Sequence, residues 1–168
     1  MANGLKMPLV EGLYGDWNEV GRWFTEAEST FDKFGDEPMK ECAELFYDRL
    51  ISNIQSQKFS WQPLNQMYLN RKRILGLDSR MLIATSNYIS GIEIKEESSV
   101  GGRLGVFVGP SPDKTHVSGL TMNVIGGIHE YGTSDGRIPA RPHYRPTWEE
   151  VRSECRNIWL RHFASFGK

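Results

Sequence analysis

Prolines at positions 139, 142 and 146 constrain this chain more than any other feature of its sequence. Proline fixes its own φ at about −65°, lacks an amide hydrogen and disfavours helix at the residue before it. The segment "RIPARPHYRP", residues 137–146, therefore cannot form the interior of a helix. We expect it to be a stiff, extended arm.

A long C-terminal helix is predicted directly after this arm. Thr147 and Glu150 have the spacing of a capping box, which places the start of the helix at about Pro146 or Thr147. Beyond this point the apolar side chains recur at intervals of three and four, as in a helix with one buried face. The predicted buried face consists of Trp148, Val151, Cys155, Ile158, Trp159 and His162.

The stretch before the arm, "GGIHEYGTSDG", raises the question of a metal site. A short helix is predicted from Val124 to Tyr131, ending at Gly132, and it carries the adjacent pair His129 and Glu130. A metalloprotease helix needs His-Glu-x-x-His, because only that spacing puts two imidazoles on one face. Thr133 occupies the position of the second histidine. A capped or hydrogen-bonded helix-end role for His129 is therefore favoured over a metal site assembled with His116, His143 or His162.

Two amphipathic helices are predicted in the N-terminal region. Apolar residues recur at helical spacing from Asp16 to Phe34, and again from Met39 to Ile54. Gly35 is expected to end the first helix, and Pro38 to sit in the first turn of the second. We therefore expect a helical hairpin within residues 1–57.

The middle of the chain changes from helical to alternating spacing. Residues 66–75 read as a short helix capped by Asn65 and ended by Gly76, with Arg71, Lys72 and Arg73 on or near its exposed side. A further short helix is expected within residues 78–89. A β-hairpin follows, with Ile92 and Ile94 on one strand, Leu104, Val106 and Val108 on the other, and Gly101 and Gly102 in the turn. "HVSGLTMNV" fits either a third strand or the approach to a helix.

The order of these elements indicates an α+β fold: a small antiparallel sheet with a β-hairpin, packed against several helices, with a long C-terminal helix. The 168 residues suit a single domain, 1–168, in which a core of residues 58–168 follows the N-terminal hairpin region. Hydrophobic residues make up 39% of the chain and charged residues 24%, which is typical of a globular protein. Cys42 and Cys155, both in predicted helices, indicate buried thiols in a reducing compartment, with a single disulfide as the alternative.

Several functional classes are disfavoured by the sequence. The formal net charge of −1 argues against a protein that mainly coats nucleic acid. There is no Gly-x-Ser-x-Gly elbow, and "GGRLGVFVG" lacks the Gly-Lys-Ser/Thr of a phosphate-binding loop. No stretch approaches the roughly 18 apolar residues that span a bilayer, and the first seventeen residues lack a signal-peptide core. We expect no enzymatic activity, no cofactor, no metal and no membrane partner.

Four segments in chain order carry a more specific pattern: "WQPLNQMYLNRKRILGLD", "LIATSNYISGI", "GGIHEYGT" and "IPARPHYRPTWEE". Together they resemble the tail-completion and virion-morphogenesis proteins of tailed bacteriophages, which are neck components also described as head–tail joining proteins. Ser86 departs from this pattern, since a glycine is usual there, and so does His143, where an aromatic residue is usual. The matching residues are Trp61, Pro63, Leu64, Lys72, Leu82, Thr85, His129, Glu130, Tyr131, Gly132 and Ile138 to Pro142.

The resemblance implies a non-enzymatic structural virion protein. It would form a homo-oligomeric ring, expected to be a hexamer, that joins the tail tube to the head connector at the neck after assembly in the host cytoplasm. Its expected partners are neck, connector and tail-tube proteins, with DNA in the ring lumen as a further contact. A tail terminator that caps tail-tube polymerisation is the alternative role within this class. From other classes, a DNA-binding accessory protein and a small metal-dependent hydrolase remain as alternatives.

On this interpretation two groups of side chains are candidate assembly contacts. Arg137, Arg141, His143 and Arg145 would project from the stiff arm, where a guanidinium pairs well with a neighbouring subunit's carboxylates. Arg71, Lys72 and Arg73 would form a basic patch, with an ordinary solvated helix face as the simpler reading.

Overall fold

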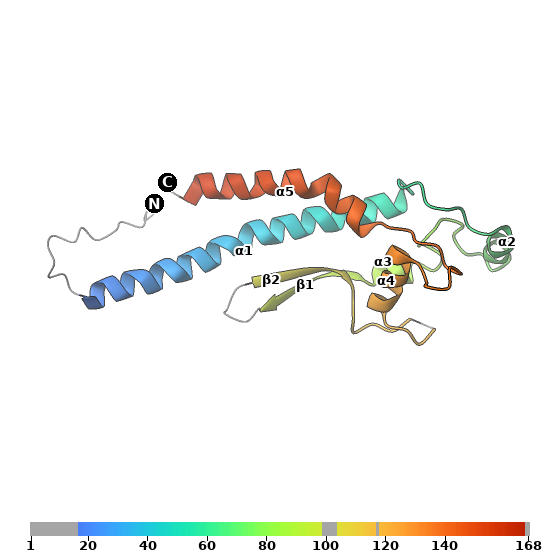
Figure 1. The fold of residues 1–168 in the computed structure, drawn as a ribbon, viewed down its shortest axis with the longest axis horizontal. Helices are drawn as coiled ribbons and strands as arrows, with labels where there is room; N and C mark the ends of the chain where they lie inside the picture. Colours follow the sequence, from blue (N-terminus) through green and yellow to red (C-terminus); the bar gives the residue numbers. More distant parts are fainter. Residues whose placement is uncertain (1–16, 99–103, 117, 167–168) are drawn as a thin grey trace.

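A computed structural model of the chain describes residues 17–98, 104–116 and 118–166, with side chains along α1 described mainly from Phe34 onward. The α+β prediction is confirmed: helices pack around one antiparallel two-stranded sheet, and a long helix closes the chain (Figure 1). The elements are α1 (Trp17–Gln55), α2 (Gln66–Ile74), α3 (Asn87–Ser90), β1 (Ile92–Ser98), β2 (Leu104–Pro110), α4 (Met122–Tyr131) and α5 (Tyr144–Phe166).

The predicted N-terminal helical hairpin is wrong, because α1 is a single helix of 39 residues. It runs through both Gly35 and Pro38 and is about 58 Å long at 1.5 Å per residue. A proline inside a helix costs roughly 3 kcal/mol. The side chain of Pro38 is, however, fully buried. Gly35 lies beside Trp159 of α5. Packing of this part of α1 against α5 and the hairpin therefore outweighs the local preference for a turn.

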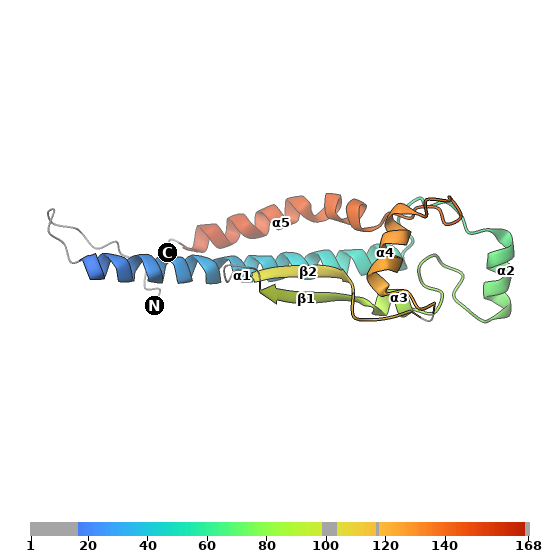
Figure 2. The same ribbon diagram turned by 60° about the horizontal axis from the view of Figure 1, so that its bottom comes forward.

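Two elements pack on opposite sides of α1. The antiparallel helix α5 lies along one side, and the β-hairpin lies along the other (Figures 1 and 2). Cys42, Val151, Cys155 and Ile158 form the buried seam between the two helices. Both cysteines are free thiols, so the predicted burial of the thiols is confirmed. The Cys42 Sγ lies 3.7 Å from the carbonyl oxygen of Cys155, and burial raises the pKa of Cys42 to about 12.

The predicted β-hairpin is confirmed, with Ile94 opposite Val108 and Glu96 opposite Val106. Its two turn glycines, Gly101 and Gly102, lie outside the described residues. An ion pair of 3.0 Å between Lys40 and Glu96 joins the hairpin to α1. The ambiguous segment after the hairpin is the approach to a helix: its described residues contain the isolated bridge between Thr115 and Thr121 but no strand, and α4 follows.

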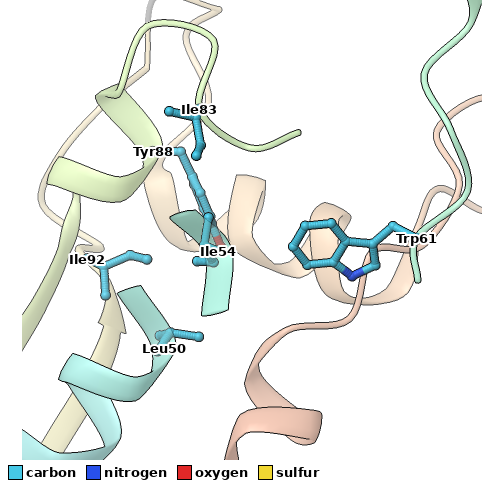
Figure 3. Close-up of a cluster of buried hydrophobic side chains, with 6 residues drawn as sticks. All are labelled: Leu50, Ile54, Trp61, Ile83, Tyr88 and Ile92. Carbon is cyan, nitrogen blue, oxygen red and sulfur yellow. The ribbon is translucent and has the colours of Figure 1, made fainter. Parts of the chain in front are cut away.

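A second core lies where α1 ends. It consists of Leu50, Ile54, Trp61, Ile83, Tyr88 and Ile92, which come from α1, the two loops on either side of α2, α3 and β1 (Figure 3). The helix predicted within residues 78–89 is mostly irregular, since only Asn87–Ser90 is helical. By contrast, α2 matches its prediction: the Asn65 side chain caps it and Gly76 follows it with φ +65°. It stands apart at one end of the molecule (Figures 1 and 2).

Candidate functional site

All four segments that carry the family resemblance contribute to one place, which we call the junction. In the structure the arm is the helix-free segment of residues 132–143, because residues 144–146 belong to α5. The junction comprises the end of α4, this arm, the start of α5, and the side chains of Trp61 and Tyr88. The Trp61 indole donates a hydrogen bond of 2.8 Å to the carbonyl oxygen of Pro142. The backbone N–H of Arg141 donates one of 2.6 Å to the carbonyl oxygen of His129. The arm is thus fixed on both sides.

Glu130 closes the junction by capping α5 from α4. Its buried carboxylate accepts hydrogen bonds from the backbone N–H groups of His143, Tyr144 and Arg145, at 2.8, 3.0 and 3.1 Å. Pro146 has no N–H, and the N–H of Thr147 bonds to the His143 carbonyl oxygen. Every backbone donor of this helix start is therefore satisfied, and a negative charge sits at the positive end of the helix dipole.

This arrangement corrects the predicted start of the C-terminal helix. The helix begins at Tyr144, and Thr147 with Glu150 does not form a capping box. The Thr147 hydroxyl instead accepts a hydrogen bond from Asn53 of α1 at 3.1 Å. Glu150 pairs with Lys58 at 2.8 Å. The arm itself is free of helix up to residue 143, as its prolines predict.

His143 is fully buried at the centre of the junction. Its Nδ1 lies 2.8 Å from the carbonyl oxygen of Arg141 and 3.5 Å from the Glu130 carboxylate, so this nitrogen carries the proton. Nε2 then accepts a hydrogen bond of 2.7 Å from the Tyr88 hydroxyl. Burial lowers the pKa of His143 and raises that of Tyr88, so both side chains are neutral at pH 7.

His129 is a second imidazole at the junction, and it is mostly buried. The hydrogen bond predicted for it at the helix end is made by its carbonyl oxygen, which accepts the N–H of Arg141, and not by its ring Nδ1. Its ring packs edge-on against Tyr88, with ring centres 4.9 Å apart, and its Nδ1 has no hydrogen-bond partner among the described residues. Burial, with smaller contributions from the charges of His143 and Arg141, lowers the pKa of His129 to about 4. It contributes an aromatic packing surface.

Two glycines of "GGIHEYGT" are required by this packing. A Cβ on Gly126 would lie 2.4 Å from the Pro110 ring, so glycine lets α4 approach the end of β2. Gly132 has φ +78°, and a Cβ there would lie 2.9 Å from backbone atoms of Ile138 and Ala140. Glycine at this position lets the arm turn back across the end of α4.

The four side chains predicted to project from the arm divide into two pairs. Arg137 and Arg145 are exposed, and Arg137 pairs with Asp135 at 3.2 Å. Arg141 is only 7% exposed and His143 is fully buried, so the prediction that these two project is wrong. The reason is that the arm packs against Trp61 and α4 and turns alternate residues inward.

The basic run on α2 divides in the same way. Arg71 and Arg73 are exposed, but Lys72 is 2% exposed and donates a hydrogen bond of 2.7 Å to the Arg80 carbonyl oxygen. The expected patch of three neighbouring cations is therefore wrong. Consecutive helical positions differ by about 100°, so three in a row cannot share one face.

Large apolar side chains are exposed on α2 and at the residue after it, among polar neighbours such as Asn70 and Arg71. Met67 is 81% exposed, Ile74 84% and Leu75 58%. We call these three side chains, together with the half-exposed Tyr68, the α2 tip. Monomeric proteins seldom expose clustered large apolar side chains, and such clusters mark interaction surfaces.

The polar side chains at the centre of the junction are too buried to contact a substrate from solvent. Tyr88, Glu130 and His143 are each at least nine-tenths buried, and their polar atoms are bonded to one another or to the backbone. Across the described residues, no three His, Cys, Asp or Glu side chains group closely enough to hold a metal ion. None of the helices described is long and apolar enough to cross a membrane. The junction is organised to hold backbone segments in place.

Sequence reasoning missed the role of Glu130 and of Tyr88. One signal for Glu130 was present: "RPHYRP" offers no Ser, Thr, Asp or Asn at the start of the helix, so the cap had to come from elsewhere in the chain. The burial of Tyr88 had no comparable local signal, because its partner His143 is 55 residues away.

Comparisons with known proteins place few limits on the function. No protein-family model matches the chain, and no solved structure matches it. The chain is similar to an uncharacterised protein of Methanocaldococcus jannaschii, with 26% identity over 120 residues. The similarity covers 71% of this chain and 79% of that protein.

Proposed function

We propose that this protein is a non-enzymatic assembly subunit of a tailed virus, a tail-completion protein that forms a ring between the tail tube and the head connector. The observation that carries the proposal is the α2 tip, where three large apolar side chains are more than half exposed on a helix standing apart from the rest of the fold. Covering apolar surface of this kind with a second subunit removes it from water, which favours association.

The residues behind the family resemblance support this proposal through their structural roles. Trp61, Glu130, Gly132 and the proline arm are joined at the junction, so the four sequence segments describe one structural unit. Ser86, at the position where a glycine is usual, has φ +59°. That left-handed conformation favours glycine, which gives the family pattern a physical reason at this position.

A closed ring needs two different surfaces on each subunit, one meeting the other on the next copy. The α2 tip supplies one apolar surface at one end of the molecule. A second lies on α5, where Trp148, Leu160 and Phe163 are about half exposed. The exposed Arg71, Arg73, Arg137 and Arg145 remain candidate contacts, whereas Lys72, Arg141 and His143 are too buried to form the surface of a subunit.

The association step is tested with Ile74→Lys in the full-length protein. We expect the wild type to form a ring, seen by electron microscopy and by sedimentation, and the variant to remain monomeric with an unchanged melting temperature. Ser79→Lys adds the same charge at an exposed position of the loop after α2 and leaves all four side chains of the α2 tip in place, so it should still assemble. Equal assembly of wild type and Ile74→Lys would contradict a role for the α2 tip.

The role in the virion is tested by inactivating the gene in its virus. Separate intact tails and filled heads in electron micrographs are expected for a joining protein. Abnormally long tails would instead assign the terminator role. Normal joined particles would exclude both roles.

A further inference from the structure

Two cations, Lys72 of α2 and Arg141 of the arm, are buried and form no ion pair with an acidic side chain among the described residues. Lys72 lies on α2 and is 2% exposed, while Arg141 lies on the arm and is 7% exposed. Buried charges in proteins are normally paired, because moving an ion out of water is costly unless an opposite charge compensates it. Neither cation of the pair therefore has the ion-pair partner that would offset the cost of burying its charge.

The hydrogen-bond capacity of both groups exceeds what the chain supplies. The Lys72 ammonium has three donors, and one bonds to the Arg80 carbonyl oxygen at 2.7 Å. The Nε of Arg141 is buried and has no hydrogen-bond partner in the described part of the chain, and its guanidinium makes no ion pair there. Asp78, the carboxylate that acts on Lys72, is already bound to Arg80 at 2.6 Å.

Tyr68 brings the two cations into one environment. The Lys72 Nζ lies 5.6 Å from the centre of the Tyr68 ring, and Tyr68 also acts electrostatically on Arg141. Burial lowers the pKa of Lys72, the carboxylate of Asp78 opposes that shift, and the positive charge of Arg141 adds to it. Lys72 and Arg141 are therefore two buried like charges close enough to act on each other, and the half-exposed Tyr68 ring lies beside Lys72.

We propose that Lys72 and Arg141, with Tyr68 at the rim, form a binding site for a small oxyanion. A phosphate or carboxylate group would accept the unused donors of both cations and cancel their mutual repulsion. The burial of both side chains limits the ligand to a single small group, which excludes the continuous backbone of duplex DNA. The site does not depend on the proposed role in the virion.

Inorganic phosphate is the probe for this site, used with full-length protein at constant ionic strength set with chloride. Binding to the folded state alone raises the melting temperature, by about 5 °C when phosphate exceeds its dissociation constant roughly a hundredfold. Acetate is titrated in parallel. A rise with phosphate assigns a phosphate ligand, and a rise with acetate alone assigns a carboxylate, such as the side chain of another protein.

Lys72→Met gives the sharpest variant, because two effects of opposite direction are expected. It removes an unpaired buried charge, so the anion-free protein should melt at a higher temperature than the wild type. It should also lose the rise on adding the anion. Arg71→Met and Arg73→Met remove the same charge from exposed positions of the same helix and should keep the full rise.

The proposal is overturned if neither anion changes the melting temperature of the wild type, or if Lys72→Met retains the rise. Isothermal titration of the wild type provides a second test that needs no folded variant. One saturable site per chain is expected, and the absence of saturable heat also overturns the proposal.

Discussion

The junction is buried and bonded to its surroundings, whereas the α2 tip exposes large apolar side chains. At the junction, one carboxylate satisfies three backbone donors, and His143 has a partner on each ring nitrogen. Three junction atoms lack a hydrogen-bond partner among the described residues, namely the His129 Nδ1, the Arg141 Nε and the Tyr144 hydroxyl. At the α2 tip, by contrast, large apolar side chains face solvent, and Lys72 on the same helix is buried without an ion pair in the described part of the chain. A satisfied network fixes one geometry. Exposed apolar side chains are stabilised only when a ligand or another chain covers them.

The contrast suggests a division of labour within one subunit. The junction holds α4, the arm and α5 in a fixed relation, so that it acts as a rigid frame. The apolar side chains of the tip remain exposed, and covering them would contribute free energy to binding a partner. Four substitutions or conditions test this contrast, and they are ordered by the size of the expected effect on the free energy of unfolding.

Glu130→Ala should have the largest effect. It strips the acceptor from three backbone N–H groups at the start of α5 and leaves them buried. Since hydrogen bonds to a charged group each contribute more than neutral ones, we expect a loss of about 4 kcal/mol in chemical denaturation. Glu149→Ala removes a carboxylate from the exposed face of the same helix, and its effect should stay within about 0.5 kcal/mol. Similar losses for the two variants would refute the capping role of Glu130.

The prediction of the fold from sequence succeeded where the signals are local. Asn65 and Gly76 bound α2, Gly132 ends α4, and alternating apolar residues form the hairpin. Each of these depends on residues within a few positions of one another. Pro38 failed as a signal because its penalty is local, whereas the packing that opposes it comes from α5 and the hairpin, far along the chain.

The candidate site was predicted less well for the same reason. "HEYG" and "PARPH" were singled out, but the link between them is a bond from Glu130 to a helix start 13 residues later. Lys72 bonds to Arg80 in the loop after α2, and Arg141 bonds to His129 of α4, so the burial of each depends on tertiary packing that no local pattern encodes. The basic run did contain one usable clue, since Tyr68 and Lys72 are four residues apart and must share a helix face.

Acid should weaken the junction through His129. Burial holds the pKa of His129 at about 4 in the folded protein, below the roughly 6.5 of an unfolded chain. The unfolded state therefore takes up the proton first as pH falls, and roughly 3 kcal/mol of stability is lost between pH 6.5 and 4. The related His143, whose pKa burial also lowers, adds to this loss.

His129→Phe keeps the aromatic contact with Tyr88 and removes the titrating group. Its free energy of unfolding, measured from pH 7 to pH 4, should fall by less than that of the wild type. His116→Gln, in the loop before α4, is the matched control and should follow the wild-type curve. If His129→Phe also follows that curve, the imidazole is not buried as described.

Adjacent glycines of α4 give a smaller effect and an internal control. An added Cβ at Gly126 meets the Pro110 ring, so Gly126→Ala should cost about 2 kcal/mol. An added Cβ at Gly127 meets nothing within 4 Å, and alanine is the better helix former, so Gly127→Ala should stabilise by about 0.5 kcal/mol. Thermal denaturation of the two variants should move in opposite directions. Equal shifts would mean that α4 does not approach β2 closely.

The smallest effect is expected at the tip, from Asn65→Ala. Its side chain caps α2 with one exposed hydrogen bond to the N–H of Met67, at 2.8 Å, and losing such a cap costs about 1 kcal/mol. Because α2 stands apart from the core, the loss should be local. Hydrogen exchange should speed up at the amides of α2 while those of α5 keep their protection. Faster exchange in both helices would show that tip and frame unfold together, and the division of the subunit into a rigid frame and a separate binding end would then be wrong.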